Sequence, residues 1–200
     1  MSDGTAAPAP HEIALLRGGP RAAVTVALVA LPPRRLAGPG RPGTVRAVPR
    51  DAATAELTSP FEDLLYGALL DRPLRPRWIV RHPDVRPAVA LVRVPLAEAG
   101  LLRWPFPGPT RAARREVAAL RARHRLPVRR HGLTDHDKLP AVALHGEAAR
   151  KALVPRFAHR TGLLPRVEVT DVGRRRLRLT GAGRRACGGA GMPEGGPPPG

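Results

Sequence analysis

The sequence predicts a mainly helical fold of two helix-turn-helix or winged-helix-like units, followed by a helical C-terminal segment, a short β-hairpin and a disordered Gly/Pro tail. Three observations lead to this prediction. A glycine corner at Gly18 separates two short helical stretches. A strong helix-start signal follows at Ser59. Aromatic residues make up only 3% of the 200 residues, so Leu, Val and Ala must fill the core, which favours closely packed helices.

The first unit, residues 11–50, opens with two helices at a corner. We expect the helices at residues 11–17 and 20–30. Gly18 suits the left-handed residue that closes a helix, and Pro20 suits the first position of the next one. The second helix is almost wholly apolar, which predicts that it is buried on most sides.

Proline and glycine interrupt the chain after this helix pair. Pro32 and Pro33 must end the second helix, since neither can continue its hydrogen-bond ladder. Residues 36–42 are rich in Gly and Pro and predict a turn, whereas residues 44–48 predict a short strand that serves as one arm of a wing. Residues 50–57 have the composition of a linker.

The second unit, residues 58–126, begins at the clearest local signal in the chain. Ser59 can cap the amides of the next turn, and Pro60 fits the first helical position. Glu62 can reach back to complete a capping box. The helix that follows runs to about Leu70 and carries its apolar residues on one side.

A further helix is expected at residues 84–99. Pro87 is tolerable because it falls in the first turn, but Pro95 should kink the helix or split it. Gly100 is the expected stop, after which residues 101–102 fold back onto the core.

The next helix, residues 111–125, carries the main candidate binding face. Thr110 can cap its first turn. Because successive residues turn by about 100°, one narrow sector is apolar and the opposite side is basic. The narrow sector is formed by Ala113, Val117, Leu120 and His124. The opposite side is formed by Arg111, Arg114, Arg115, Arg121 and Arg125.

Residues 127–185 are expected to hold a helical segment and a hairpin. Helices are predicted at residues 139–151 and 156–160, and Gly162 stops the second of them. Two segments of the pattern Thr-x-x-Gly-Arg-Arg predict a short hairpin within residues 167–180. The arginines of this pattern are Arg174, Arg175, Arg184 and Arg185.

Both ends of the chain have the composition of disordered segments: residues 1–10 form a leader, and residues 186–200 are mostly Gly and Pro. The only cysteine, Cys187, lies in this tail, which excludes an intramolecular disulfide and a zinc site with two cysteines. The longest apolar run, residues 22–31, is too short to span a bilayer, and the chain does not begin with a signal-peptide pattern. We therefore expect a cytoplasmic protein without a transmembrane segment.

The net charge of +18 at pH 7 has two readings. Only Lys138 and Lys151 are lysines, and all other basic residues are arginine. Such a preference, together with abundant Ala, Pro, Gly and Val, is typical of GC-rich codon usage. A chain this basic nevertheless binds polyanions non-specifically at low salt, so nucleic acid is an expected non-specific partner.

Several of these segments resemble an uncharacterised protein family from GC-rich bacteria. Residues 15–31 match its opening pattern of a helix, a Gly-Gly-Pro-Arg corner and an apolar second helix. Residues 96–102 and 141–163 resemble later helical blocks, and the tail around Cys187 resembles a degenerate Gly/Cys-rich tail. Members of that family often carry membrane spans, and this chain would be a soluble, divergent member. The resemblance implies an architecture and no activity.

The densest cluster of ionisable residues lies between His131 and Asp137. Its imidazoles and carboxylates are ligand types that suit zinc or manganese. However, His131 and His136 are five residues apart, which does not place both on one helical face. We read the segment as a solvated loop, and we predict no metal, no cofactor and no catalytic residues. An enzyme with a site formed by His131, Asp135 and His136 remains the third reading.

The sequence thus predicts a non-enzymatic interaction module with an unidentified protein partner. Such a module would expose an apolar patch around Trp78, Trp104 and Phe106. The alternative is a winged-helix-like transcriptional regulator that binds DNA through the arginine side of residues 111–125 and through the arginines of the C-terminal repeats.

Overall fold

The computed structural model describes residues 8–49, 59–103, 108–127 and 133–164. This part of the chain is mainly helical and contains one small antiparallel sheet, which confirms the predicted fold class in its coarse form. The expected leader, linker, C-terminal hairpin and Gly/Pro tail fall largely or wholly outside these residues.

Helix α1 (Pro10–Ala30) contains the predicted glycine corner. Its two halves meet at Gly18 (φ −143°, ψ 16°) and Gly19 (φ 72°, ψ −166°), and Pro20 opens the second half. We had expected the left-handed residue at Gly18, but the structure places it at Gly19. A residue without a Cβ is favoured there, because positive φ brings a Cβ into conflict with the backbone.

A short turn and a hairpin follow α1. The 3₁₀ helix η1 (Pro32–Arg34) leads into strand β1 (Ala37–Pro39), which pairs antiparallel with strand β2 (Val45–Ala47). Strand β2 confirms the predicted strand, whereas β1 lies where we expected only a turn. Residues 37–39 form a strand because they pair with β2. The strand ends at Pro39, which has no N–H to donate to the ladder.

Three helices follow the hairpin: α2 (Pro60–Asp71), α3 (Pro76–Ile79) and α4 (Val85–Glu98). Helices α2 and α4 were predicted, and α3 was not. Helix α4 runs unbroken through Pro95, so the expected kink or split was wrong. The proline lies in the last turns of the helix, where the hydrogen bond that it removes involves the exposed Leu91.

The remaining helices are α5 (Arg111–Arg123), α6 (Asp135–His145), α7 (Glu147–Leu153) and α8 (Pro155–Thr161). Helix α6 begins before the expected start because Thr134 caps it, accepting the amide of Asp137 at 3.2 Å. Gly146, at φ 60°, separates α6 from α7, where we had expected one helix. Gly162, at φ 75°, ends α8 as predicted.

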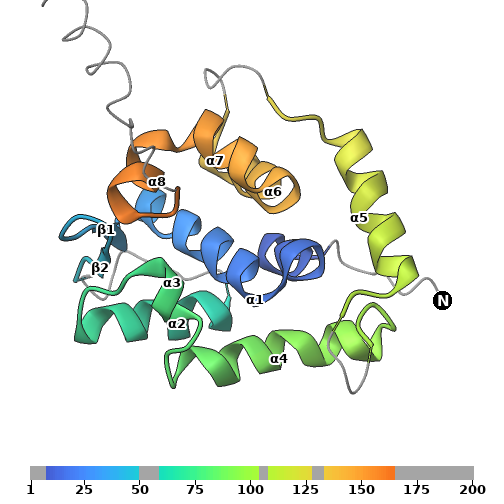
Figure 1. The fold of residues 1–200 in the computed structure, drawn as a ribbon, viewed down its shortest axis with the longest axis horizontal. Helices are drawn as coiled ribbons and strands as arrows, with labels where there is room; N and C mark the ends of the chain where they lie inside the picture. The colour runs from blue at the N-terminus through green and yellow to red at the C-terminus, as the bar shows by residue number, and fades with distance from the viewer. Residues whose placement is uncertain (1–7, 50–58, 104–107, 128–132, 165–200) are drawn as a thin grey trace, which may run out of the picture. The chain divides into compact units, whose positions relative to one another are not determined.

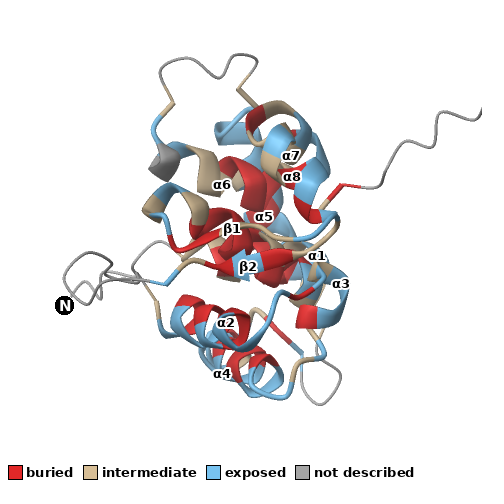
Figure 2. Cartoon of the chain, turned by 90° about the vertical axis from the view of Figure 1, so that its left-hand side faces the viewer, coloured by how far each residue is buried: buried red, intermediate tan, exposed pale blue. Residues whose placement is uncertain are grey.

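Helix α1 lies between two groups of helices, with α2 and α4 on one side and α6 and α7 on the other (Figure 1). Val24 and Leu28 belong to the apolar cluster that α1 shares with α2, α3, α4 and the hairpin. Val26 and Val29 belong to a second cluster, shared with α6 and α7. The two predicted N-terminal units therefore share one core through α1, whose buried residues are shown in red in Figure 2.

The central position of α1 also explains its hydropathy. Within the described residues, one segment, residues 10–34, is long and apolar enough to cross a membrane by length and composition. Its 18-residue apolar window has a mean hydropathy of 1.4, and 61% of that window is buried inside the fold. A helix enclosed by protein on both sides needs the same apolar surface as one enclosed by lipid, so the burial accounts for the composition without a membrane.

Candidate nucleic-acid interface

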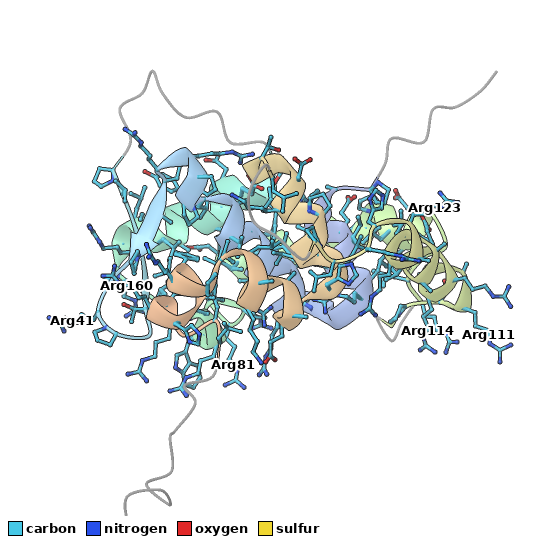
Figure 3. The ribbon with its side chains drawn as sticks, turned by 90° about the horizontal axis from the view of Figure 1, so that it is seen from above. Arg41, Arg81, Arg111, Arg114, Arg123 and Arg160 are labelled. Carbon is cyan, nitrogen blue, oxygen red and sulfur yellow. The ribbon has the colours of Figure 1, made fainter. Side chains whose placement is uncertain are left out.

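Helix α5 presents its arginines as the sequence pattern predicts. Thr110 caps the helix, and its Oγ1 accepts the amide of Ala113 at 3.2 Å. Ala113 and Val117 are buried and hold the helix against the core. With this side fixed, the arginine side faces away from the protein (Figure 3). Helix α5 ends at Arg123, two residues before the expected end, so Arg125 lies just beyond it. All five arginines assigned to this face are exposed: Arg111, Arg114, Arg115, Arg121 and Arg125.

The arginine face of α5 (Arg111, Arg114, Arg115, Arg121 and Arg125) has little acidic compensation. Glu116 is the only acidic residue of α5. The ion pairs found among the described residues include Arg34 with Glu62, His82 with Asp84 and Lys151 with Glu147, and none of these involves a member of the arginine face. Arg111, Arg114 and Arg115 thus lie where an external anion can reach them.

The second half of α1 is not available for DNA reading. In a helix-turn-helix protein, the second helix lies in the major groove and contacts base edges. Here residues 21–30 are almost all buried in the two apolar clusters, and only Arg21 is exposed. The helix pair at the glycine corner is present, but its second helix serves as the centre of the core. A contact with nucleic acid must therefore come from another element, of which α5 is the best exposed.

Several predicted site residues fall outside the part of the chain that the structure describes. They are Trp104, Phe106, His131, Arg174, Arg175, Arg184 and Arg185. Helix α6 includes Asp135 and His136, but their side chains are not described. Among the described residues, no group of three or more His, Cys, Asp or Glu residues is placed to hold a metal ion.

Trp78 is the described member of the predicted aromatic patch. It is 48% exposed and lies on α3. The Cζ atoms of Arg77 and Arg81 are 5.4 and 5.2 Å from the centre of its ring, distances typical of cation–π contacts. The surface here is thus basic and aromatic rather than purely apolar.

An exposed apolar ridge lies instead on α2 and α4. Leu64, Leu91 and Val94 are each at least 40% exposed. Leu64 and Leu91 line one shallow hollow of about 170 Å³, so the two helices contribute to one surface. We name Leu64, Leu91 and Val94 the α2–α4 ridge.

His11 and Ser59 line the same hollow. Ser59 Oγ accepts the amide of Glu62 at 3.3 Å, and among the described residues no hydrogen bond joins it to His11. The His11 ring packs on Phe61, with 5.3 Å between ring centres. Burial lowers the pKa of His11, and the carboxylates of Glu12 and Glu62 oppose this shift. Ser59 therefore acts as a helix cap, and His11 acts as a packing residue.

Comparison with protein-family models, with curated proteins and with solved structures finds no match. The resemblance to a family from GC-rich bacteria thus stays a prediction.

The sequence reasoning missed one group of residues. Arg17 and Arg150 lie close together although they are far apart in the chain, and each has a buried Nε atom without a hydrogen-bond partner among the described residues. The only sequence signal was that each is an arginine next to an apolar helical stretch. Such a signal is too weak in a chain so rich in arginine.

Proposed function

We propose that this protein is a non-enzymatic interaction module whose contact surface is the arginine face of α5, and that its partner is double-stranded nucleic acid. The observation that carries the proposal is the exposure of all five arginines without an acidic partner among the described residues. Arginine binds phosphate groups well because its planar fork donates two parallel hydrogen bonds.

The shape of α5 supports a backbone contact. The helix spans 13 residues, or about 20 Å. Ala118 and Ala122 lie on the same side as Arg111 and Arg115, so small side chains separate the guanidinium groups and allow a close approach. Contacts of this kind supply affinity and set the position of the protein, whereas base contacts supply specificity. We therefore expect binding that depends strongly on salt and weakly on sequence.

The test compares two triple variants that remove the same number of charges. The first is Arg111→Gln, Arg114→Gln and Arg115→Gln, on α5. The control is Arg41→Gln, Arg86→Gln and Arg160→Gln, at exposed sites on other elements. Arg41 and Arg160 lie far from α5 in Figure 3. Binding of a random duplex is measured from about 50 to 300 mM salt, where affinity reports the number of phosphates contacted.

If the arginine face of α5 is the contact, the plot of log affinity against log salt loses about 0.9 of slope for each phosphate contact removed, or about 2.7 in the first variant. The control should keep nearly the wild-type slope. Equal losses in both variants would mean that the charge acts diffusely, and the proposal would then be abandoned. A second duplex pool, made from genomic fragments, tests whether any sequence preference survives the higher salt.

The α2–α4 ridge favours a second candidate function, the binding of a protein partner. Leu91 is 65% exposed and Val94 is 51% exposed, both on α4, and Leu91 lines the same hollow as the exposed Leu64 of α2. Adjacent exposed apolar side chains are typical of interaction sites. A photoreactive amino acid at Leu91 should form one discrete adduct in cells, whereas the same group at the exposed Arg72 should not. Identical adduct patterns at both positions would contradict this candidate.

A further inference from the structure

Arg17 of α1 lies near two arginines of other elements, Arg150 of α7 and Arg121 of α5, whose charges act on it. Arg17 ends the first half of α1, and its guanidinium lies against the buried Gly146. A Cβ added at Gly146 would come within 2.9 Å of Arg17 Cζ and 3.0 Å of Nη2. The missing side chain of Gly146 thus provides the space that the guanidinium occupies.

Arg150 lies one helical turn beyond this glycine. Its amide donates to the carbonyl of Gly146 at 3.1 Å, which places Arg150 on the same side of α7 as the Arg17 guanidinium. Arg121 lies in the last turn of α5 and is exposed. The pKa of Arg17 is lowered by burial and, in addition, by the charges of Arg150 and Arg121. The pKa of Arg150 is also lowered by burial.

The Nε atoms of Arg17 and Arg150 are both buried, and neither has a hydrogen-bond partner among the described residues. A buried donor without a partner is costly, so folded proteins rarely keep two side by side without an ion or water between them. The carboxylate of Glu147 pairs with Lys151 at 2.6 Å, and its charge partly offsets the lowering of the Arg150 pKa. None of the ion pairs found among the described residues includes Arg17, Arg121 or Arg150.

We propose that Arg17, Arg121 and Arg150 form a binding site for a tetrahedral oxyanion, namely a phosphate group. The orphan Nε–H donors and the remaining guanidinium N–H groups offer several donors to such an ion, and a phosphate of charge near −2 balances most of the local charge. The phosphate belongs either to the backbone of a nucleic acid or to a small phosphorylated molecule. The two sources share this chemistry and are separated by the experiment below.

The inference is independent of the proposed function, because Arg17 and Arg150 do not belong to the arginine face of α5. Only Arg121 is common to both, and the variants therefore avoid it. Phosphate binding that persists in the Arg111, Arg114 and Arg115 triple variant would show that the site works even if α5 does not contact nucleic acid.

The experiment measures thermal unfolding of the full chain while inorganic phosphate replaces chloride at constant ionic strength. We expect the wild-type unfolding temperature to rise with phosphate until it saturates, since a ligand that binds only the folded state stabilises it. Arg17→Gln and Arg150→Gln should each weaken the apparent affinity about tenfold or more. Arg86→Gln, at an exposed site on α4, is the matched control and should respond like the wild type.

A second readout in chloride alone keeps the test decisive if a variant is altered in stability. Without phosphate, Arg17→Gln and Arg150→Gln should unfold at the wild-type temperature or above it, because each removes one of three mutually repelling charges. A lower unfolding temperature in chloride, or a phosphate response undiminished in both variants, would overturn the proposal.

The source of the phosphate is settled by repeating the titration with a short DNA duplex. A response to the duplex and not to inorganic phosphate, lost in Arg17→Gln and Arg150→Gln, assigns the site to a nucleic-acid phosphate. If inorganic phosphate stabilises the protein and the duplex does not compete with it, the site is assigned to a small phosphorylated molecule. The absence of any response to either probe overturns the proposal.

Discussion

Arg34 donates to the carboxylate of Glu62 across 2.6 Å, and this ion pair joins the turn after α1 to the first turn of α2. The Glu62 side chain is only 8% exposed, and Arg34 covers it from the solvent side with 30% of its own side chain exposed. The sequence pattern had assigned Glu62 to a capping box with Ser59. The Ser59 cap is present, but the carboxylate pairs with Arg34 instead.

Breaking this pair should destabilise the fold, because Arg34→Gln leaves the buried carboxylate of Glu62 without its counter-charge. We expect a loss of about 2 kcal/mol in the free energy of unfolding. Urea unfolding of the variant measures it. Arg46→Gln, at an exposed position on β2, is the control and should change the free energy by less than about 0.5 kcal/mol. Similar values for the two variants would mean that the ion pair contributes nothing.

The stability of the fold should depend on pH through His11. Its pKa in the folded state lies below the ordinary value of 6.5, chiefly because the ring is buried. The unfolded chain therefore binds the proton more readily, and the stability that is present above pH 6.5 is lost as the pH falls through 6.5 toward the folded pKa. His11→Asn should flatten this dependence in denaturant unfolding between about pH 8 and pH 5. An unchanged slope in that variant would assign the dependence to other groups.

Leu65 tests the position of the core. It is fully buried in α2, within the cluster that α1 shares with α2 and α4. Leu65→Ala should reduce the free energy of unfolding by about 2–5 kcal/mol, the range for large-to-small changes in a core. Leu91→Ala removes the same atoms from a side chain that is 65% exposed and should cost far less. Calorimetric unfolding of both variants makes the comparison, and equal losses would contradict the packing described here.

We expect substitution by alanine to have opposite effects on stability at two glycines. Gly19 has φ 72° at the corner in α1, with no atom near an added Cβ, so Gly19→Ala should cost about 1 kcal/mol or more through backbone strain alone. Gly67 lies exposed inside α2 and also has open space around it. Gly67→Ala should stabilise the fold by about 0.5–1 kcal/mol, because alanine is the better helix former. Thermal unfolding of the pair checks both signs.

Local chemistry was enough to predict helices α2 and α5, each of which begins with a cap, and the glycine corner of α1. Ser59 and Thr110 cap their own next turns, and such contacts depend only on residues two or three positions away. The arginine face of α5 is likewise a consequence of helical periodicity. Two local predictions failed. Helix α4 continues through Pro95, and α6 begins at Asp135 because Thr134 caps it.

The sequence by itself determined most of the helical segments, though not α3 or the break between α6 and α7, and it also determined where α5 turns its arginines and that the second half of α1 must be buried. Only the tertiary structure decided that α1 lies between two helical groups, that Glu62 pairs with Arg34, and that Arg17 meets Arg150 beside Gly146. The physical reason is the range of the interactions. Caps and helical faces are fixed by neighbours within a few residues, whereas these contacts join distant segments and form only when the whole chain has packed around α1.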